Sequence, residues 1–398
     1  MEINLQSPEG FSLSAGGPFN RALEMMRLQN KQGKLMVLGF CITWLPLLIL
    51  TLFEGTLYTG RELPFLKDVA MHARLLVALP MLIMIEPTID SKVFVVIKYL
   101  AEELMSLEDR QKFLTTSFRR ARKLTGSALT EIILLLIVIG VTISFVKAGV
   151  YNAPGNGTTS WMTYTGEAGQ LMSVAGYWAI FISIPIFQFL LLRWLWRYII
   201  WVMLLIHLSK AKLNLMPTHA DRAGGLGIIM IAQRSFNLIF VAGGVAISGR
   251  LIEQLLKHPD SFESIKRQGI AYIVFCLIFL LVPLLFFMGK LFKIKNEGLL
   301  RMSNLGATLS RRFEHEWVNN LQVEEKTVKN KAEQTEVDPS MIFDYSGMYD
   351  ALQQLRTIPV TPRDLIGMGL ILFVPFIPIP FIHFSVVELL HKIAGLLA

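Results

Sequence analysis

Two charged residues lie inside long apolar runs of this 398-residue sequence, where a charge is costly. Arg234 lies about two turns into the run 228–251, flanked by Gln233 and Asn237, and Glu86 lies deep in an earlier run. A charge in hydrocarbon is unfavourable unless it meets a partner or water, so such residues commonly mark an ion or substrate pathway. We therefore expect Glu86, Gln233, Arg234 and Asn237 to line a polar pathway, or Glu86 and Arg234 to form an ion pair.

Both charges also have ordinary structural explanations, which the sequence leaves open. Arg234 can form a structural salt bridge, or it can lie only about 10 Å from the start of its helix, at 1.5 Å per residue, and reach the interface with its long side chain. Glu86 can end a helix, because Pro87 follows it and proline breaks the backbone hydrogen bonding. In that case a second helix starts near Thr88.

The segment 217–227 could hold an anion. Asp221 can cap the helix that follows, while glycines at 224, 225 and 227 let the backbone present its N–H groups closely. Together with a basic side chain, this geometry would suit a small anion or the phosphate of a lipid. The predicted anion-site residues are His219, Asp221, Arg222, Gly224 and Gly225. A capped turn without a ligand is the alternative.

No enzyme or metal motif is present in the sequence. There is no P-loop, His-Glu-x-x-His or Gly-x-Ser-x-Gly, and the seven histidines lack metal-ligand spacing. Cys41 and Cys276 both fall inside apolar runs, where cysteine usually packs as a small apolar residue. We expect no metal, no cofactor and no disulfide, and the sequence favours a non-enzymatic function without deciding the question.

The composition defines the class of protein. At 53% apolar and 17% charged, the chain is too apolar for an ordinary soluble protein of its length. Its net charge of +8 comes from Lys and Arg that flank apolar runs, which is a membrane pattern and argues against nucleic acid as a partner. We predict an all-α, polytopic transmembrane helix bundle with about seven membrane segments, amphipathic surface helices and a cytoplasmic helical segment.

The positions of the elements follow from apolar runs and breaks. We expect an amphipathic surface helix over 101–124, a surface helix over 193–209 or else a second span there, and cytoplasmic helices over 296–332 and 348–355. Prolines at 375, 378 and 380 make the last span either a full crossing or a re-entrant hairpin, followed by a surface helix over 386–397. The predicted spans are 35–53, 74–100, 127–146, 170–192, 228–251, 269–292 and 365–384.

Charge distribution predicts an orientation. The segments 98–126, 193–226 and 290–363 are rich in Lys and Arg, whereas 148–168 has none. Because cytoplasmic segments carry the excess of Lys and Arg, the N-terminus is expected inside. The predicted regions are a cytoplasmic N-terminal segment 1–34, a transmembrane bundle 35–292, a cytoplasmic helical segment 293–363 and a proline-rich membrane segment with a C-terminal helix, 364–398.

Two sequence blocks resemble a known group of proteins. The run from Phe187 to Arg197, Phe-Gln-Phe-Leu-Leu-Leu-Arg-Trp-Leu-Trp-Arg, and the loop Pro-Thr-His-Ala-Asp-Arg-Ala-Gly-Gly-Leu-Gly at 217–227 look like a block in bacterial polytopic inner-membrane proteins of unassigned function. The resemblance covers about two spans. It implies a bacterial inner membrane and no particular reaction.

Three functions remain open at this stage. The first is a channel or transport protein, expected to be a homo-oligomer, with its pathway between the broken second span and the fifth span. The second is a membrane enzyme or lipid-phosphate-binding protein that uses the 217–227 loop. The third is a sensor or scaffold that acts through the helices of 296–357. The expected partners are the lipid bilayer, a second copy, and an anionic lipid or small ion.

Overall fold

A computed structural model describes residues 16–28, 31–148, 160–166, 169–315 and 339–383. Within these residues, seven helical segments are long and apolar enough to cross a membrane, which confirms the predicted all-α membrane bundle. The segments are Gln32–Phe53, Val69–Glu103, Ala128–Lys147, Val174–Lys210, Leu226–Lys257, Pro259–Phe313 and Pro362–His383.

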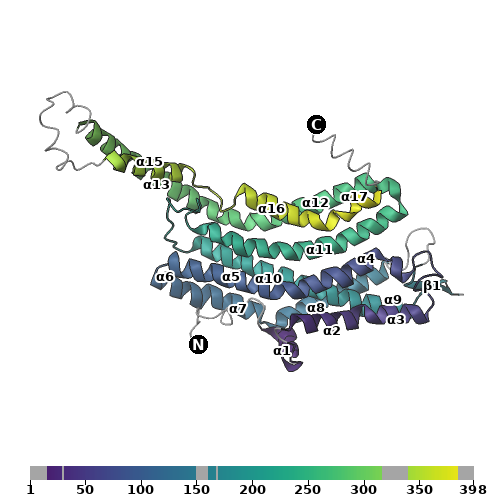
Figure 1. The fold of residues 1–398 in the computed structure, drawn as a ribbon. Helices are drawn as coiled ribbons and strands as arrows, with labels where there is room; N and C mark the ends of the chain where they lie inside the picture. The colour runs from purple at the N-terminus through teal and green to yellow at the C-terminus, as the bar shows by residue number, and fades with distance from the viewer. Residues whose placement is uncertain (1–15, 29–30, 149–159, 167–168, 316–338, 384–398) are drawn as a thin grey trace.

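The spans lie side by side, with α5 (Leu79–Glu103), α10 (Ile184–Lys210) and α11 (Ile229–Lys257) running through the bundle (Figure 1). Large aliphatic side chains cover the outward face of α8 (Ala128–Lys147), where residues such as Leu136 are exposed. An exposed apolar face of this size on a long helix is what lipid tails cover in a membrane.

The second span is one continuous path, in which helical turns of different width accommodate the prolines. It consists of α4 (Val69–His72), a π-helical turn (Ala73–Ala78) and α5, which runs through Pro87 without ending. Pro80 has no backbone N–H to donate, and its ring crowds the preceding turn. The wider π-helical turn accommodates both effects. The expectation that the helix ends near Glu86 is therefore wrong, and Glu86 lies within α5.

The fourth span has the same construction, with α9 (Val174–Trp178), a π-helical turn (Ala179–Ser183) and then α10. The prediction that 193–209 lies on the membrane surface, or forms a second span, is wrong. Trp194 and Trp201 are buried inside the bundle, and their indole N–H groups have hydrogen-bond acceptors there. Because neighbouring helices accept hydrogen bonds from both indole N–H groups, the two tryptophans can stay buried and do not need the polar membrane interface.

The sixth span continues far beyond the bundle. It comprises α12 (Phe262–Leu281), a 3₁₀ segment (Val282–Phe287) and α13 (Met288–Phe313), so the predicted boundary at residue 292 falls inside α13. The predicted short helix is longer than expected, since α15 covers Pro339–Gln353. It packs antiparallel to α13, and the two helices project together from one end of the bundle (Figure 1).

The last span does not turn back within the described residues. It consists of α16 (Pro362–Phe373), a 3₁₀ turn (Val374–Phe376) and α17 (Pro378–His383). It runs parallel to α11 along its length, because Arg234 pairs with Asp364 at one end and Gly244 lies against Pro375 further along. This path agrees with a full crossing, and the predicted helix over 386–397 lies outside the described residues.

Shorter elements close the two ends of the bundle. At one end, Asp68 caps α4 and accepts a hydrogen bond of 2.9 Å from the indole of Trp161, next to an antiparallel hairpin of two strands. At the other end the predicted amphipathic helix over 101–124 is broken into parts that bury Phe113 and Phe118. The remaining elements are α1 (Gly17–Met25), α2 (Gln32–Thr43), α3 (Leu45–Phe53), α6 (Leu107–Lys112), a π-helical turn (Phe113–Phe118), α7 (Arg119–Thr125), β1 (Thr163–Gly166) and β2 (Gly169–Met172), with 3₁₀ turns at Phe65–Lys67, Leu226–Ile228 and Pro259–Ser261.

Candidate functional site

A buried ion pair joins α8 to α10. Nε of Arg193 lies 3.2 Å from Oε1 of Glu131, and the two side chains are 7% and 9% exposed. Glu131 is in the first turn of α8, where the helix dipole favours a negative charge. Each of these charges has lost its hydration, and the attraction of the other charge offsets that cost only while the two stay close together. The pair therefore fixes the positions of both helices.

The N-terminal helix α1 completes the site around this pair. Nη2 of Arg193 donates to Oδ1 of Asn20 at 2.7 Å, and the backbone N–H of Phe19 donates to Oε2 of Glu131 at 2.7 Å. The Arg193 guanidinium also lies 4.5 Å from the centre of the Phe19 ring, as in a cation–π contact. The ion pair therefore holds α1 against the membrane bundle.

Gly17 makes this close approach possible. Its φ is +88°, a conformation that side chains with a Cβ rarely adopt, and a Cβ there would lie 2.6 Å from Oε1 of Glu131. The Glu131 carboxylate thus occupies the space that a side chain at residue 17 would need.

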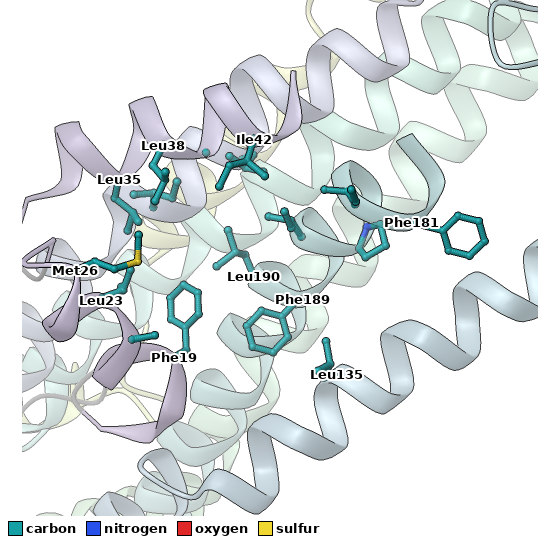
Figure 2. A pocket seen from close by; sticks show the side chains of 17 residues that line it. Phe19, Leu23, Met26, Leu35, Leu38, Ile42, Leu135, Phe181, Phe189 and Leu190 are labelled. Atoms are coloured by element: carbon teal, nitrogen blue, oxygen red, sulfur yellow. The ribbon is translucent and has the colours of Figure 1, made fainter. Parts of the chain in front are cut away.

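An apolar pocket of about 500 Å³ lies next to the ion pair, between α1, α2, α5, α8 and α10 (Figure 2). We call it the α1–α10 pocket. Phe19 connects the pocket to the ion pair, because its ring lines the pocket and also lies against the Arg193 guanidinium. The lining is apolar throughout: Phe19, Ala22, Leu23, Met26, Leu35, Leu38, Gly39, Ile42, Leu79, Ile83, Leu135, Phe181, Ile182, Pro185, Ile186, Phe189 and Leu190.

Glu86 belongs to the neighbourhood of this site and does not pair with Arg234. Its carboxylate is half-buried and close enough to Arg193 to interact with it electrostatically. One helical turn along α10, the buried Arg197 lies 4.6 Å from the ring of Trp194. Two ionisable side chains of α10, Arg193 and Arg197, thus lie close to Glu86 of α5 and Glu131 of α8.

Arg234 and its two predicted companions have separate roles. Arg234 forms an ion pair with Asp364 of α16, and its side chain is 51% exposed. Gln233 is completely buried, where it accepts from the Trp201 indole at 2.9 Å and donates to the carbonyl of Leu280 at 2.6 Å.

Asn237 is also buried, and its amide donates to the carbonyl of Met368 at 3.1 Å. Gln233 and Asn237 therefore tie α11 to neighbouring helices, α11 to α10 and α12 in one case and α11 to α16 in the other. Arg234 is the exposed member of the three.

The 217–227 loop already contains an anion of its own. The Asp221 carboxylate accepts the backbone N–H groups of Ala223 at 2.8 Å, Gly225 at 3.1 Å and Gly227 at 2.8 Å. Burial alone would raise the pKa of Asp221, but these three hydrogen bonds and one with the His219 side chain outweigh it, and the pKa lies below its usual value. These N–H groups face Asp221, so a bound phosphate would have to displace the carboxylate.

The same loop anchors the segment after α15. The Arg356 side chain donates to the carbonyl of Asp221 at 2.5 Å, and its backbone N–H donates to the carbonyl of Arg222 at 2.8 Å. His219 lies 2.8 Å from the Asp221 carboxylate, while Arg222 is exposed and has a φ of +51°. The loop thus joins the bundle to the projecting α13–α15 pair.

Sequence reasoning missed the ion pair. Glu131 is a lone acid near the start of an apolar run, and Arg193 lies in a Trp-Arg cluster typical of a membrane interface. The presence of one acid and one base at similar depth in different spans was the available signal. Asn20 carried no signal, because only the packing of α1 brings it to Arg193.

The fold and the site define a polytopic, helical membrane protein with ionisable groups buried beside an apolar pocket. No family model, curated protein or solved structure matches the chain. Its function must therefore be inferred from its own geometry.

Proposed function

We propose that this chain is a membrane transport protein whose substrate is an amphiphile, with its apolar part in the α1–α10 pocket. The observation that carries the proposal is the apolar pocket beside the buried Glu131–Arg193 ion pair. A volume of about 500 Å³ is within the usual range for small-molecule sites. Ionisable groups at membrane depth are expensive, and they are commonly kept where a polar group must bind or pass.

The pocket is accessible from the membrane. Met26, Leu135 and Phe181 line it and are 54%, 47% and 50% exposed, so its rim reaches the surface that lipid would cover. A molecule with an apolar chain can therefore enter sideways from the bilayer.

An ion path along α11 has less support. Gln233 is fully buried and its amide groups are hydrogen bonded to protein, and Asn237 is buried against α16. Both side chains are buried among helices, and Oδ1 of Asn237 has no hydrogen-bond partner among the residues that the structure describes, whereas the α1–α10 pocket reaches the surface. For this reason we favour an amphiphile over a small ion as the substrate.

The proposed orientation places the N-terminus in the cytoplasm of a bacterial cell, with the chain in the inner membrane. In support, the Lys- and Arg-rich segments of α7, the 211–225 connection and α13 lie at one end of the bundle (Figure 1). An excess of Lys and Arg is typical of the cytoplasmic side. Labelling single cysteines placed at exposed Arg120 and exposed Asp260 from each side of the membrane tests this: only the cysteine at 120 should react from the cytoplasm.

Transport can be tested by filling the pocket. In Leu190→Trp a larger ring occupies the space between α1 and α10, and Leu136→Trp is the matched control, since Leu136 is 61% exposed on α8 and does not line the pocket. Liposomes containing a fluorescent phospholipid report its transfer between leaflets when an impermeant reductant bleaches the outer leaflet. We expect faster transfer with the wild type and Leu136→Trp than with Leu190→Trp or empty liposomes.

Two results would overturn the proposal. One is no faster transfer with the wild type than in empty liposomes, for fluorescent phospholipids and a fluorescent fatty acid alike. The other is equal transfer by Leu190→Trp and the wild type. Thermal unfolding of both variants shows whether each one is folded.

A further inference from the structure

We infer that the amphiphile is anionic, and that its phosphate or carboxylate group lies at a basic edge of the α1–α10 pocket made by Arg27, Lys31 and Lys34. This inference rests on the proposed function, because it assigns the chemical class of the molecule in that pocket. It does not depend on whether the molecule is moved across the membrane.

The basic edge lies between the end of α1 and the first turn of α2. Met26, in the last turn of α1, and Leu35, in the first turns of α2, both line the pocket. Arg27, Lys31 and Lys34 fall between these two positions in the chain. These three residues therefore border the mouth of the pocket.

Within the described residues, the charges of this edge have no acidic partner. All three basic side chains are exposed, and none forms an ion pair with another residue that the structure describes. Glu24 is the single acid of the sequence between residues 16 and 34. In contrast, Arg193 further inside has Glu131 as its partner, so its charge is already balanced.

An anionic amphiphile complements both parts of the site, the basic edge with its head group and the apolar pocket with its chain. Lys and Arg near a membrane surface attract anionic lipid, and hydrogen bonds from a cationic donor to phosphate or carboxylate are stronger than neutral ones. Behind the basic edge, the wall from Phe181 in the π-helical turn to Leu190 of α10 extends for about 14 Å, at roughly 1.5 Å per residue, which leaves room for an acyl chain. The chain and the charged group can thus be bound together.

The test compares head groups on the same protein. Purified protein is titrated with a phosphatidylglycerol, a phosphatidylcholine of the same chains, and palmitate, and bound molecules are counted by native mass spectrometry. The triple variant Arg27→Gln, Lys31→Gln, Lys34→Gln removes three charges from the edge. Its matched control is Arg119→Gln, Arg120→Gln, Lys123→Gln, which removes three exposed charges from α7, none of them in the pocket lining.

We expect the wild type to retain phosphatidylglycerol, palmitate or both in preference to phosphatidylcholine. Phosphatidylglycerol alone would identify a phospholipid, and palmitate alone a free fatty acid. The edge variant should bind the anionic molecule at least about tenfold more weakly, since each basic residue near the surface contributes measurably, while the α7 variant should bind as the wild type does.

Three outcomes would overturn the inference, and they separate it from the proposed function. Equal binding of phosphatidylcholine, abolished by Leu190→Trp, would refute the anionic class and leave the pocket as the site. An equal loss in the edge and α7 variants would mean that basic surfaces bind lipid generally. Unchanged binding in Leu190→Trp would refute both the anionic assignment and the pocket.

Discussion

Glu131 and Arg193 lie 3.2 Å apart within the bundle and are both almost inaccessible, yet each also contacts α1. Through this one pair, a helix near the N-terminus of the chain is attached to two membrane spans. The pair also lies next to the α1–α10 pocket, since Phe19 contacts both. Substitutions in this pair should therefore change both the stability of the bundle and the position of α1 as a wall of the pocket.

Removing only one charge of the pair should be strongly destabilising. In Glu131→Gln, Arg193 stays buried without its counter-charge, which typically costs about 3–5 kcal/mol. In the double variant Glu131→Leu, Arg193→Met no charge is left unpaired, so we expect less destabilisation than in the single variant. Thermal unfolding in detergent, followed by tryptophan fluorescence, measures both. A double variant less stable than Glu131→Gln would contradict this explanation.

The attachment of α1 should depend on the absence of a side chain at Gly17. Gly17→Val places a Cβ against the Glu131 carboxylate and needs a φ that valine avoids, so α1 should separate from α8. Hydrogen exchange should rise at residues 17–25 and stay unchanged in α11. The control is Gly33→Val, because a Cβ at Gly33 would meet nothing within 4 Å. Equal exchange in α1 of both variants would show that Gly17 does not fix this helix.

Asp364 should contribute more to stability than Arg234, although they form one ion pair. Asp364 also accepts hydrogen bonds from the backbone N–H of Thr361 at 2.8 Å and from its hydroxyl at 2.7 Å, as a capping box at the start of α16. Asp364→Ala removes the carboxylate half of this capping box together with the ion pair, while Thr361 remains as the N-cap residue, and the loss of a capping interaction costs about 1 kcal/mol. Arg234→Gln removes the ion pair of a half-exposed side chain, which is worth about 0–1 kcal/mol.

The measurement is again thermal unfolding, combined with hydrogen exchange in residues 362–373. Faster exchange there in Asp364→Ala than in Arg234→Gln is expected. Equal exchange in the two variants would mean that the ion pair, and not the capping box, secures α16.

The class of fold could be predicted from the sequence because hydrocarbon imposes a simple requirement. Each span needs about 20 apolar residues, and all seven predicted spans coincide with membrane-length helices. Helix breaks were predicted less well. Pro87 lies inside an unbroken helix, with its ring exposed on the outer face while Ile85 and Ile89 on either side of it are buried in the bundle. That packing is not contained in a sequence pattern.

The candidate site could be predicted only in part. Glu86 was recognised as a costly buried charge, but its neighbour Arg193 was assigned to an interface, since Trp and Arg together are common there. The pocket has no sequence signal at all, because its walls are ordinary apolar residues from five helices. Which apolar residues leave a space between them depends on packing alone.

The stability of the 217–227 loop should depend on pH through Asp221. Its pKa in the folded protein lies below the ordinary value of 3.8, so the ionised carboxylate stabilises the fold at pH above 3.8. That contribution is lost as the pH falls through the folded-state pKa, when the carboxylate becomes protonated. Asp221→Asn keeps one acceptor oxygen and loses the charge, so at pH 7 it should be less stable by about 1–3 kcal/mol.

The difference between the wild type and Asp221→Asn should therefore shrink in acid. Melting temperatures measured from pH 7 to pH 3 test this, with Asp260→Asn as a control at an exposed aspartate in the turn between α11 and α12. A constant difference across this pH range would mean that the charge of Asp221 does not stabilise the loop.

The projecting α13–α15 pair should depend on Gly306. A Cβ at this position would lie 2.6 Å from Cζ of Tyr345, whose hydroxyl donates to the carbonyl of Met302 at 2.9 Å. Gly306→Leu should push the Tyr345 ring away, break this hydrogen bond and loosen α15, because leucine extends beyond the Cβ. Gly289→Leu, on the same helix α13, is the control, since a Cβ there would meet nothing within 4 Å. Hydrogen exchange over residues 339–353 should rise in Gly306→Leu only.

The loop contact of Arg356 should hold the end of α15, so the rise should be larger at Tyr345 than at Leu352. A uniform rise along α15 would show that Arg356 does not anchor it.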